Sequence, residues 1–447
     1  MSQTCQSGPR CIETVTSLEH SIALKRYLER HIEPGLPTPP TGRSWCHVLV
    51  IPAYRESPGL LQRLGQSFSR QDGILVVLVL NRPDSDPDTL ANTPLRTAIQ
   101  TMPGEALSDH AGLYRHDTGL DIAMLDIESA TGATPTDQGV GLARKAGCDL
   151  ALTWMAAGAV TSHWIHCSDA DATLPADYFQ RLDRAQGPVA LFPFRHTPGQ
   201  DSVCNTATAL YELRLHHYVL GLEYAGSPYA FHSLGSCLAI SAQAYAQVRG
   251  FPKRSGGEDF YLLNKAAKTG TLVRLKGRCI ELQSRQSNRV PFGTGPAVAA
   301  IAGAESATDA QIFYHPSTFD ALRAVLLAVQ ALSRGEQQQL HSALADHGLP
   351  DILLHATQAA LRPMGFEAAL AHCQRQSRNS EQFMRHFHQW FDGFRTLKLI
   401  HAISDAGYSR QSLSELANLS TLLWPGNSHA QEPSEQLQAI YQHWGWN

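Results

Sequence analysis

Short apolar runs alternate with segments of helical spacing through the first two-thirds of the chain. The runs at residues 46–52 and 74–81 are rich in β-branched residues and too short for buried helices, which predicts buried parallel strands. Between them, apolar residues in the segment 59–70 recur at helical spacing. Strand, helix and strand in this order make a βαβ unit, so the sequence predicts an α/β fold.

The same patterns predict the remaining elements as far as about residue 300. Strands are expected at 122–127, 163–167, 189–194, 237–241 and 272–275, and helices at 137–157, 175–185, 203–222, 242–248 and 258–269. The segment 81–138 contains few strand signals and several acidic residues, and apart from the strand at 122–127 and the start of the helix at 137 its structure is left open.

Helical patterns dominate after residue 300. One helix is expected at 317–331, and another begins at Asn379-Ser380-Glu381. The second helix carries a strongly apolar face made of Phe383, Phe387, Trp390, Phe391, Phe394 and Leu397. We expect this face to pack on the α/β domain or on a second copy of the chain, which would make a homo-oligomer.

Three parts are therefore expected along the chain. Residues 1–45 form a helix, capped by Ser17 and running to about Arg30, followed by a Pro-rich linker. Residues 46–298 form the α/β domain, and residues 299–447 form a helical C-terminal region.

Composition excludes several classes of protein. The 447 residues are 43% hydrophobic with a formal net charge of −4, and no basic run suggests nucleic-acid binding. Nine scattered cysteines without a CxxC pair predict neither a disulfide framework nor a zinc site, so a cytoplasmic location is expected. The first ten residues lack the apolar core of a signal peptide, and no apolar stretch is long enough to span a bilayer.

Two carboxylates, Asp169 and Asp171, follow the strand expected at 163–167. Residues one apart in an extended backbone point to the same side, where two carboxylates could hold a hard divalent cation that bridges to phosphates. A simpler reading is that Asp171 or Thr173 caps a helix beginning near Pro175.

Two further segments carry candidate chemistry. Pro52 and Glu56 lie at the end of the first strand, where ligands bind in open α/β sheets. Glu258 and Asp259 follow a Gly-rich turn and open a helix. Either acid could cap that helix, or one could act as a general base in a cleft.

Together these segments make the chain resemble family-2 glycosyltransferases of the GT-A fold. The resemblance rests on VIPAYRE at 50–56, SDADATLPADYF at 168–179, and the run from GSCLAISAQAYAQVRGFP to GEDFYLL at 235–263. The order and spacing of the segments carry it, over about residues 46–295.

The resemblance implies transfer of a sugar from a nucleotide-diphosphate donor to an acceptor hydroxyl, with inversion and with Mn²⁺ or Mg²⁺ as cofactor. Asp259 would be the catalytic base, with Glu258 orienting it, and Asp169 and Asp171 would contact the metal. The nucleotide-sugar site would be formed by Pro52, Tyr54, Glu56, Asn81, Arg144, Asp169, Gly235, Ser236 and Arg289. The acceptor is not implied.

Some of these assignments have plain alternatives. Arg144 and Lys145 follow a Gly-x-Gly that lacks the third glycine of a dinucleotide site, and Lys145 could equally lie on a solvated helix face. Arg289 lies in a Pro- and Gly-rich loop. His232 or His315 could complete a metal site, although a packed or solvated histidine is the simpler reading.

Two other functions compete with glycosyl transfer. A nucleotidyltransferase would normally open with a Gly-rich loop and a basic residue after the first strand, where this chain has Pro-Ala-Tyr-Arg-Glu. A non-catalytic protein that binds a nucleotide-sugar or glycan would not need Asp169, Asp171 and Asp259 together. The transmembrane helices and Gln-x-x-Arg-Trp motif of processive family members are absent, which favours single transfer.

Overall fold

The computed structural model describes residues 21–69, 71–284, 293–304, 306–336, 339–419, 425 and 432–447. Its internal contacts divide the chain into two compact units. Unit 1 comprises residues 1–197, 233–296 and 446–447, and unit 2 comprises residues 198–232 and 297–445. The expected boundaries at 45/46 and 298/299 remain a prediction, and the segment 198–232 groups with the later helices rather than with its neighbours in sequence.

Unit 1 is built on a mixed β-sheet, which confirms the α/β class. Within the described residues the sheet has nine strands in the order β11-β8-β10-β6-β1-β2-β5-β4-β3. The four central strands β6, β1, β2 and β5 are parallel, and β10 and β4 are antiparallel to their central neighbours. The strands are β1 (His47–Ala53), β2 (Ile74–Leu80), β3 (Gly104–Ser108), β4 (Ala111–Arg115), β5 (Asp121–Asp126), β6 (Trp164–Cys167), β8 (Val189–Leu191), β10 (Leu238–Ser241) and β11 (Val273–Arg274).

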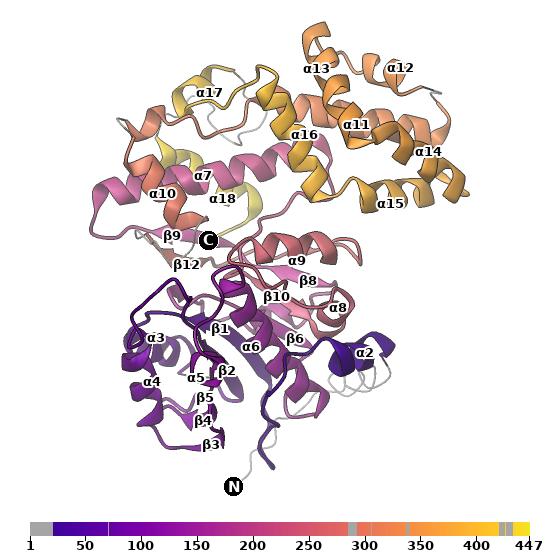
Figure 1. Ribbon diagram of the computed structural model, residues 1–447. Helices are drawn as coiled ribbons and strands as arrows, with labels where there is room; N and C mark the ends of the chain where they lie inside the picture. The colour runs from indigo at the N-terminus through magenta and orange to yellow at the C-terminus, as the bar shows by residue number, and fades with distance from the viewer. Residues whose placement is uncertain are drawn as a thin grey trace. The chain divides into compact units, whose positions relative to one another are not determined.

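Helices cover the central strands. All seven residues of β2 are buried, as expected for a parallel strand with both faces covered. Helix α6 (Gly139–Ala156) packs on β1, β2 and β6 (Figure 1). It approaches closely at Gly147, where an added Cβ would lie 2.5 Å from Val50 Cγ1. The other helices of unit 1 are α2 (Ile22–Arg30), α3 (Gly59–Phe68), α4 (Thr93–Gln100), α5 (Ile127–Thr131), α8 (Ala242–Gln247) and α9 (Glu258–Ala266).

The strand expected at 189–194 is in fact two strands. The first part is β8, and the second is β9 (Phe194–Thr197), which pairs with β12 (Ile280–Gln283) in a separate sheet with β7 (Ala172–Thr173). Pro193 separates β8 from β9 and has no N–H to donate to a ladder, which explains the break.

The helix expected at 175–185 is wrong. Only a 3₁₀ turn, η1 (Gln180–Leu182), forms there. The preceding Tyr178 and Phe179 are both buried and both pack on the ring of His166, with centroids 5.0 and 4.7 Å away. This aromatic packing directs consecutive side chains into the core and so determines the local path of the chain.

The segment 81–138 contains α4, the β3–β4 hairpin, β5 and α5. Strand β3 forms the edge of the sheet, and none of its residues is buried. An exposed edge strand needs no apolar alternation, which explains why the sequence carries little signal for it.

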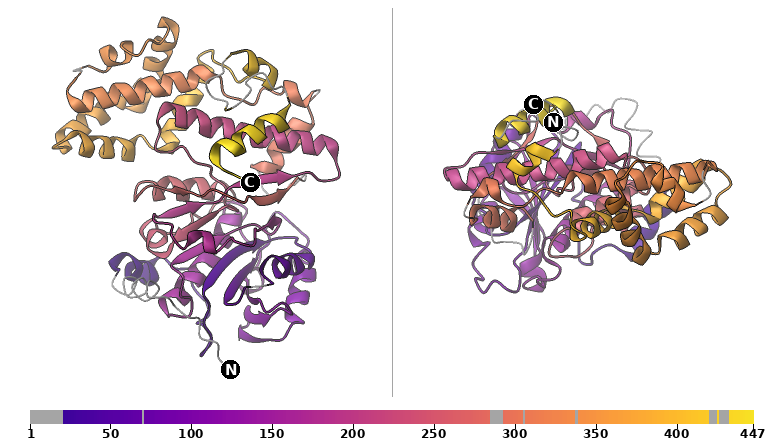
Figure 2. Two further views of the ribbon diagram at one scale, coloured as in Figure 1. Left: turned by 180° about the vertical axis from the view of Figure 1, so that it is seen from behind. Right: turned by 90° about the horizontal axis from the view of Figure 1, so that it is seen from above.

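Unit 2 is helical among the described residues. Its helices are α7 (Ser202–Ala225), α11 (Pro316–Arg334), α12 (Leu340–Ala345), α13 (Asp351–Leu361), α14 (Phe366–Gln376), α15 (Ser380–Trp390), α16 (Gly393–Asp405), α17 (Leu413–Leu419) and α18 (Pro433–Trp444), with α10 (Thr294–Ala302) crossing the division between the units. Short 3₁₀ turns lie at η2 (Ala307–Asp309) and η3 (Arg362–Met364). Helices α11 and α18 both pack along α7 (Figure 2).

The single helix expected from Asn379 is divided in two. The Asn379 side chain caps α15 by accepting from the Gln382 N–H, as its sequence suggested. Helix α15 ends at Trp390, and Asp392 then caps α16 by accepting from the Arg395 N–H. Phe394, which lies beyond this break, is 40% exposed and does not belong to the buried face.

Two further expectations concern membranes and cysteines. No helix among the described residues is long and apolar enough to cross a membrane. Six described cysteines are free and buried, and Cys46 is disulfide-bonded, a single bond that the scattered cysteine pattern did not predict. The expected Ser17 cap lies outside the described residues, and α2 is capped by Ser21.

The buried His217 on α7 makes the stability of the protein depend on pH. Burial lowers its pKa from 6.5 to about 4, although a hydrogen bond to the Tyr314 carbonyl, at 2.9 Å, opposes the shift. Below pH 6.5 the unfolded chain takes up a proton that the folded His217 does not, so this residue alone should lower the free energy of unfolding by about 2 kcal/mol between pH 7.5 and 5. Urea unfolding of the H217Q variant should lose about that much of the pH dependence.

The exposed His355 on α13 supplies the matched control. The H355Q variant should show the same pH dependence as the unchanged protein. Equal pH dependence in H217Q and the unchanged protein would contradict a neutral buried His217.

Candidate functional site

The candidate site lies where the parallel strands of unit 1 end. Because β6, β1 and β2 are parallel neighbours in register, their carboxyl ends meet at one edge of the sheet. Tyr54 follows β1, Asn81 follows β2, and Ser168 and Asp169 follow β6. Backbone bonds continue the ladder into this edge, from the Asn81 N–H to the Ala53 carbonyl at 3.2 Å and from the Ser168 N–H to the Val50 carbonyl at 3.0 Å.

The centre of the site is a group of charged residues, called here the Arg144 cluster and made of Arg144, Asp169, Glu258 and Asp259. Arg144 is ion-paired with Asp169 and Glu258, and Asp259 follows Glu258 in the chain. The Arg144 side chain is only 4% exposed. Its Nη2 donates to Asp169 Oδ1 at 2.5 Å and its Nε donates to Glu258 Oε1 at 2.9 Å. Burial alone would lower the pKa of Arg144, but the carboxylates of Asp169 and Glu258 outweigh burial and raise it. One guanidinium thus joins the end of β6 to the start of α9.

Gly235 makes room for the Arg144 guanidinium. A Cβ at this position would lie 2.6 Å from Arg144 Nη2 and 2.7 Å from its Cζ. The same residue donates its N–H to Asp259 Oδ2 at 2.9 Å. Gly235 therefore contacts both the Arg144 guanidinium and the predicted base Asp259. The sequence motif predicted Gly235 as part of the nucleotide-sugar site but did not predict these two contacts.

Asp259 has the electrostatics of a general base. It is the second residue of α9, a helix that begins directly after Gly257, whose φ of 65° suits glycine. Burial, followed by the charge of Glu258, raises the pKa of Asp259 to about 7. Arg144 and the N–H groups of Phe260 and Gly235 oppose this rise. A carboxyl group with a pKa near neutral pH can accept a proton from a substrate hydroxyl.

The donor set at the end of β6 fits a divalent metal only in part. The Asp169 side chain is 42% exposed while its Oδ1 pairs with Arg144, and Asp171 is partly exposed. No group of three or more His, Cys, Asp or Glu side chains that could hold an ion is found among the described residues. Two carboxylates suit Mg²⁺ or Mn²⁺ when substrate phosphates and water complete the coordination. These residues therefore fit a metal ion whose coordination is completed by the substrate. They do not fit a metal site in which the protein supplies every ligand.

A second network, called here the Asp86 cluster, contains Tyr54, Arg55, Asp86 and Asn92. Asp86 accepts from the Tyr54 hydroxyl at 2.5 Å and from both Nε and Nη2 of Arg55, at 2.9 and 2.7 Å. The Arg55 side chain, followed by the Tyr54 hydroxyl, lowers the pKa of the Asp86 carboxyl. Arg55 has a φ of 55°, which is unusual for a residue with a side chain, and its N–H donates to Asn92 Oδ1 at 3.0 Å.

The Asp86 cluster connects the ends of β1, β2 and β5. Asn92 donates from Nδ2 to the Asn81 carbonyl at 2.9 Å and to Glu128 Oε2 at 3.1 Å. Glu128 is also paired with Arg82 and Arg96. None of the residues Arg82, Asp86, Asn92, Arg96 and Glu128 was predicted as a site residue. The sequence signal that could have found them is the acidic stretch directly after Asn81.

The structure thus joins some predicted residues by hydrogen bonds. It brings together Arg144, Asp169, Gly235, Glu258 and Asp259 in one network, and Tyr54 and Asn81 in the other. Of the remaining predicted residues, Pro52 lies within β1, Glu56 and Ser236 are buried, and Asp171 is partly exposed. Arg289 lies outside the described residues.

Lys145 belongs to a different network from its neighbour Arg144. Its Nζ donates to Asp149 Oδ2 at 2.7 Å, to the Tyr27 hydroxyl at 2.8 Å and to the His31 carbonyl at 2.7 Å. Lys145 is therefore a buried residue that holds α2 against α6, which corrects the reading of a solvated helix surface.

The Gly-x-Gly at the start of α6 serves close packing. An added Cβ at Gly141 would lie 2.6 Å from the Arg254 nitrogen, and the Gly141 N–H donates to the Arg254 carbonyl at 2.9 Å. These glycines therefore allow the loop at Arg254 to approach α6 closely. Close packing explains the Gly-x-Gly without a dinucleotide site.

The two candidate third metal ligands have other contacts within unit 2. His315 Nδ1 accepts from the Ser317 N–H at 3.1 Å and caps α11. His232 Nε2 lies 2.9 Å from His216 Nδ1.

Comparisons with known proteins add little. No protein-family model matches the chain, and no curated protein matches it. One similar solved structure is the mannosyltransferase PcManGT from Pyrobaculum calidifontis in complex with GDP-Man and Mn²⁺. The two chains are 16% identical, and the match covers 89% of this chain and 95% of that one with a TM-score of 0.34. A similarity at this level supports no inference about this chain.

Removing the guanidinium should be the most damaging change to the Arg144 cluster. R144M leaves the buried Glu258 carboxylate without its ion-pair partner, which should lower the free energy of unfolding by about 3–5 kcal/mol at pH 7. The double variant R144M/E258Q removes both charges and should be more stable than R144M alone. Chemical denaturation of the variants measures the difference.

Arg334 provides the control, because it is 52% exposed and its ion-pair partner Glu336 is 56% exposed. R334M should cost at most about 1 kcal/mol. The cluster would not be the constraint described if R144M cost no more than R334M, or if the double variant were less stable than R144M.

Proposed function

We propose that the protein is a glycosyltransferase of the GT-A fold and family 2, which moves a sugar from a nucleotide-diphosphate donor to an acceptor hydroxyl with inversion. The observation that carries the proposal is the Arg144 cluster. It ties a carboxyl group with a pKa near 7, Asp259, to the carboxylate Asp169 at the carboxyl end of a parallel strand. A base beside a carboxylate that can hold a metal is what displacement of a nucleoside diphosphate by a hydroxyl requires.

The reaction gives each residue a role. The acceptor oxygen attacks the anomeric carbon while Asp259 takes its proton, and the bond from that carbon to the diphosphate breaks. Glu258 raises the pKa of Asp259 through its charge and is itself held by Arg144. The Gly235 N–H keeps Asp259 Oδ2 oriented. Because attack and departure occur on opposite sides of the anomeric carbon, the configuration inverts.

The donor would bind along the edge formed by β1, β2 and β6. Tyr54 and Asn81, held by the Asp86 cluster, would contact the nucleoside, and Asp169 the ribose or metal. Pro52, Glu56, Ser236 and Arg289 complete the proposed donor and acceptor surfaces. Asp169 and Asp171 would hold Mn²⁺ or Mg²⁺, which supplies positive charge against the departing diphosphate.

Substitution of the base tests the chemistry. D259N should lower kcat by about 10²–10⁴-fold while leaving affinity for the nucleoside diphosphate unchanged, because the amide keeps the shape but cannot accept the proton. In the unchanged protein kcat/KM should rise with pH through a pKa near 7, since the base works only when deprotonated. Donor turnover across pH 5–9 measures both.

The exposed Asp177 gives the matched control, and D177N should retain full turnover. Product stereochemistry by NMR checks inversion. A D259N variant that turns over normally, or a product with retained configuration, would contradict the assignment of Asp259 as base.

Thermal stability tests the donor and the metal. UDP or GDP at about 100 times its Kd should stabilise the native protein by about 2.7 kcal/mol, and its Kd should be lower when Mn²⁺ or Mg²⁺ is present. D171N should lose the metal-dependent part of the Tm increase, whereas D137N, at an exposed position, should keep it. If UDP or GDP raised the Tm equally with and without the metal, the metal would have no part in donor binding. Release of pyrophosphate from a nucleotide substrate would indicate nucleotidyl transfer in place of glycosyl transfer.

A further inference from the structure

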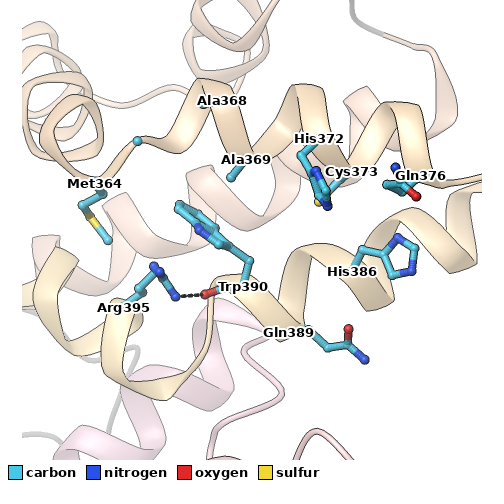
Figure 3. Close-up of a pocket in the computed structure, with 11 residues that line it drawn as sticks. Met364, Ala368, Ala369, His372, Cys373, Gln376, His386, Gln389, Trp390 and Arg395 are labelled. Carbon is cyan, nitrogen blue, oxygen red and sulfur yellow. Dashed lines mark hydrogen bonds between the residues drawn. The ribbon is translucent and has the colours of Figure 1, made fainter.

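Unit 2 contains a pocket of about 770 Å³ built from α14, α15 and α16 (Figure 3). This volume is typical of small-molecule sites. One face of α14 forms a wall, and the space is left open by the small residues Ala368 and Ala369 of this helix and Gly365 just before it. The Trp390 indole, at the end of α15, projects into the middle of the lining residues.

Trp390 is held rigidly from one side. The Arg395 guanidinium carbon lies 4.5 Å from the centre of its ring, and Arg395 Nη1 donates to the Trp390 carbonyl at 2.6 Å. The ring centroid of Phe366 lies 5.7 Å away in an edge-on arrangement. The indole is nevertheless partly exposed, so a fixed aromatic surface is presented to the pocket.

Polar side chains with unused hydrogen-bonding groups surround this surface. His372, Gln376 and Gln389 are exposed and line the pocket. Within the part of the chain that the structure describes, their side chains and the Trp390 indole N–H have no hydrogen-bond partner. Two amides, an imidazole and an indole offer both donors and acceptors for a ligand with several hydroxyl groups.

The charge of the lining argues against an ionic ligand. It contains no carboxylate to attract an ammonium group. Its possible metal ligands are His372, Cys373 and His386, and no group of three such side chains that could hold an ion is found among the described residues. Its one permanent cation, Arg395, is already engaged with Trp390 through its ring and its carbonyl. Cys373 offers no nucleophile, because burial raises the pKa of its thiol.

We propose that this pocket binds a neutral carbohydrate. A sugar ring has an apolar face of C–H groups that can stack on the Trp390 indole, and an edge of hydroxyls that can bond to His372, Gln376 and Gln389. The combination of a rigid aromatic surface, unused amide and imidazole groups and no free charge matches that chemistry. The proposal does not depend on the activity of unit 1, because every residue in it belongs to unit 2.

Neutral trisaccharides test the proposal on the full chain. Maltotriose, mannotriose, chitotriose and globotriose are each titrated, with binding followed by ligand-observed saturation-transfer NMR and calorimetry. At least one should bind, and its Kd should not change with saturating UDP or GDP and Mn²⁺, nor in D259N. Binding that nucleotides abolish would place the sugar at the donor site and overturn the proposal.

Variants locate the binding. H372A/Q389A removes exposed side chains that make no described hydrogen bond, so it should fold normally and weaken binding by about tenfold or more. W390L should do the same by removing the stacking surface. The control H355A/Q442A changes the same residue types at exposed positions outside the pocket and should bind normally.

Three results would overturn the proposal. The first is that none of the trisaccharides binds the folded protein. The second is that H372A/Q389A binds as well as the control, which would place the sugar elsewhere. The third is that inorganic phosphate displaces the sugar from the pocket, since this would show an anion site centred on Arg395.

Discussion

The buried guanidinium of Arg144 is the constraint on which the candidate site depends. It is reached from three directions: from the end of β6 through Asp169, from the start of α9 through Glu258, and from the loop at Gly235, whose missing side chain admits it. A buried cation must be paired, so the burial of Arg144 favours an arrangement that keeps both carboxylates beside it. Asp259 owes its position to this arrangement, because it follows Glu258 in α9, whereas its raised pKa comes from its own burial and from the charge of Glu258.

The strongly patterned elements could be predicted from the sequence. Strands β1, β2, β5, β6 and β10 and helices α3, α6, α7 and α9 lie where apolar runs and helical spacing indicated. Predictions failed where tertiary contacts determined the path: at 175–185, where Tyr178 and Phe179 turn into the core, and at Pro193, which divides two strands between two sheets. The division between α15 and α16 was missed because one apolar stripe continues across the Asp392 cap.

Site residues, like secondary-structure elements, could be predicted where the local sequence pattern is strong. Asp169 and Glu258, which both accept hydrogen bonds from Arg144, were predicted correctly as neighbours in one site. Each lies next to a strand end or a helix start that the sequence pattern identifies. Asp86 and Asn92 were missed because they lie in irregular chain and act on distant residues. Their importance is visible only in the structure, where they hold Arg55 at a φ of 55° and cross-link the ends of β1 and β2. Such strain persists where surrounding contacts over-determine it, and it concentrates at functional sites.

The two candidate sites differ in how they use charge. At the sheet edge, charged groups are buried and paired, as with Arg144 at 4% exposure, so a charged ligand entering there can exchange partners with groups that are already oriented. In the pocket of unit 2 the only permanent cation of the lining is engaged with Trp390, and the open hydrogen-bonding groups are neutral. The donor proposed for unit 1 carries a diphosphate, which oriented charged groups can bind. The sugar proposed for unit 2 is neutral and needs only hydrogen bonds and a stacking surface.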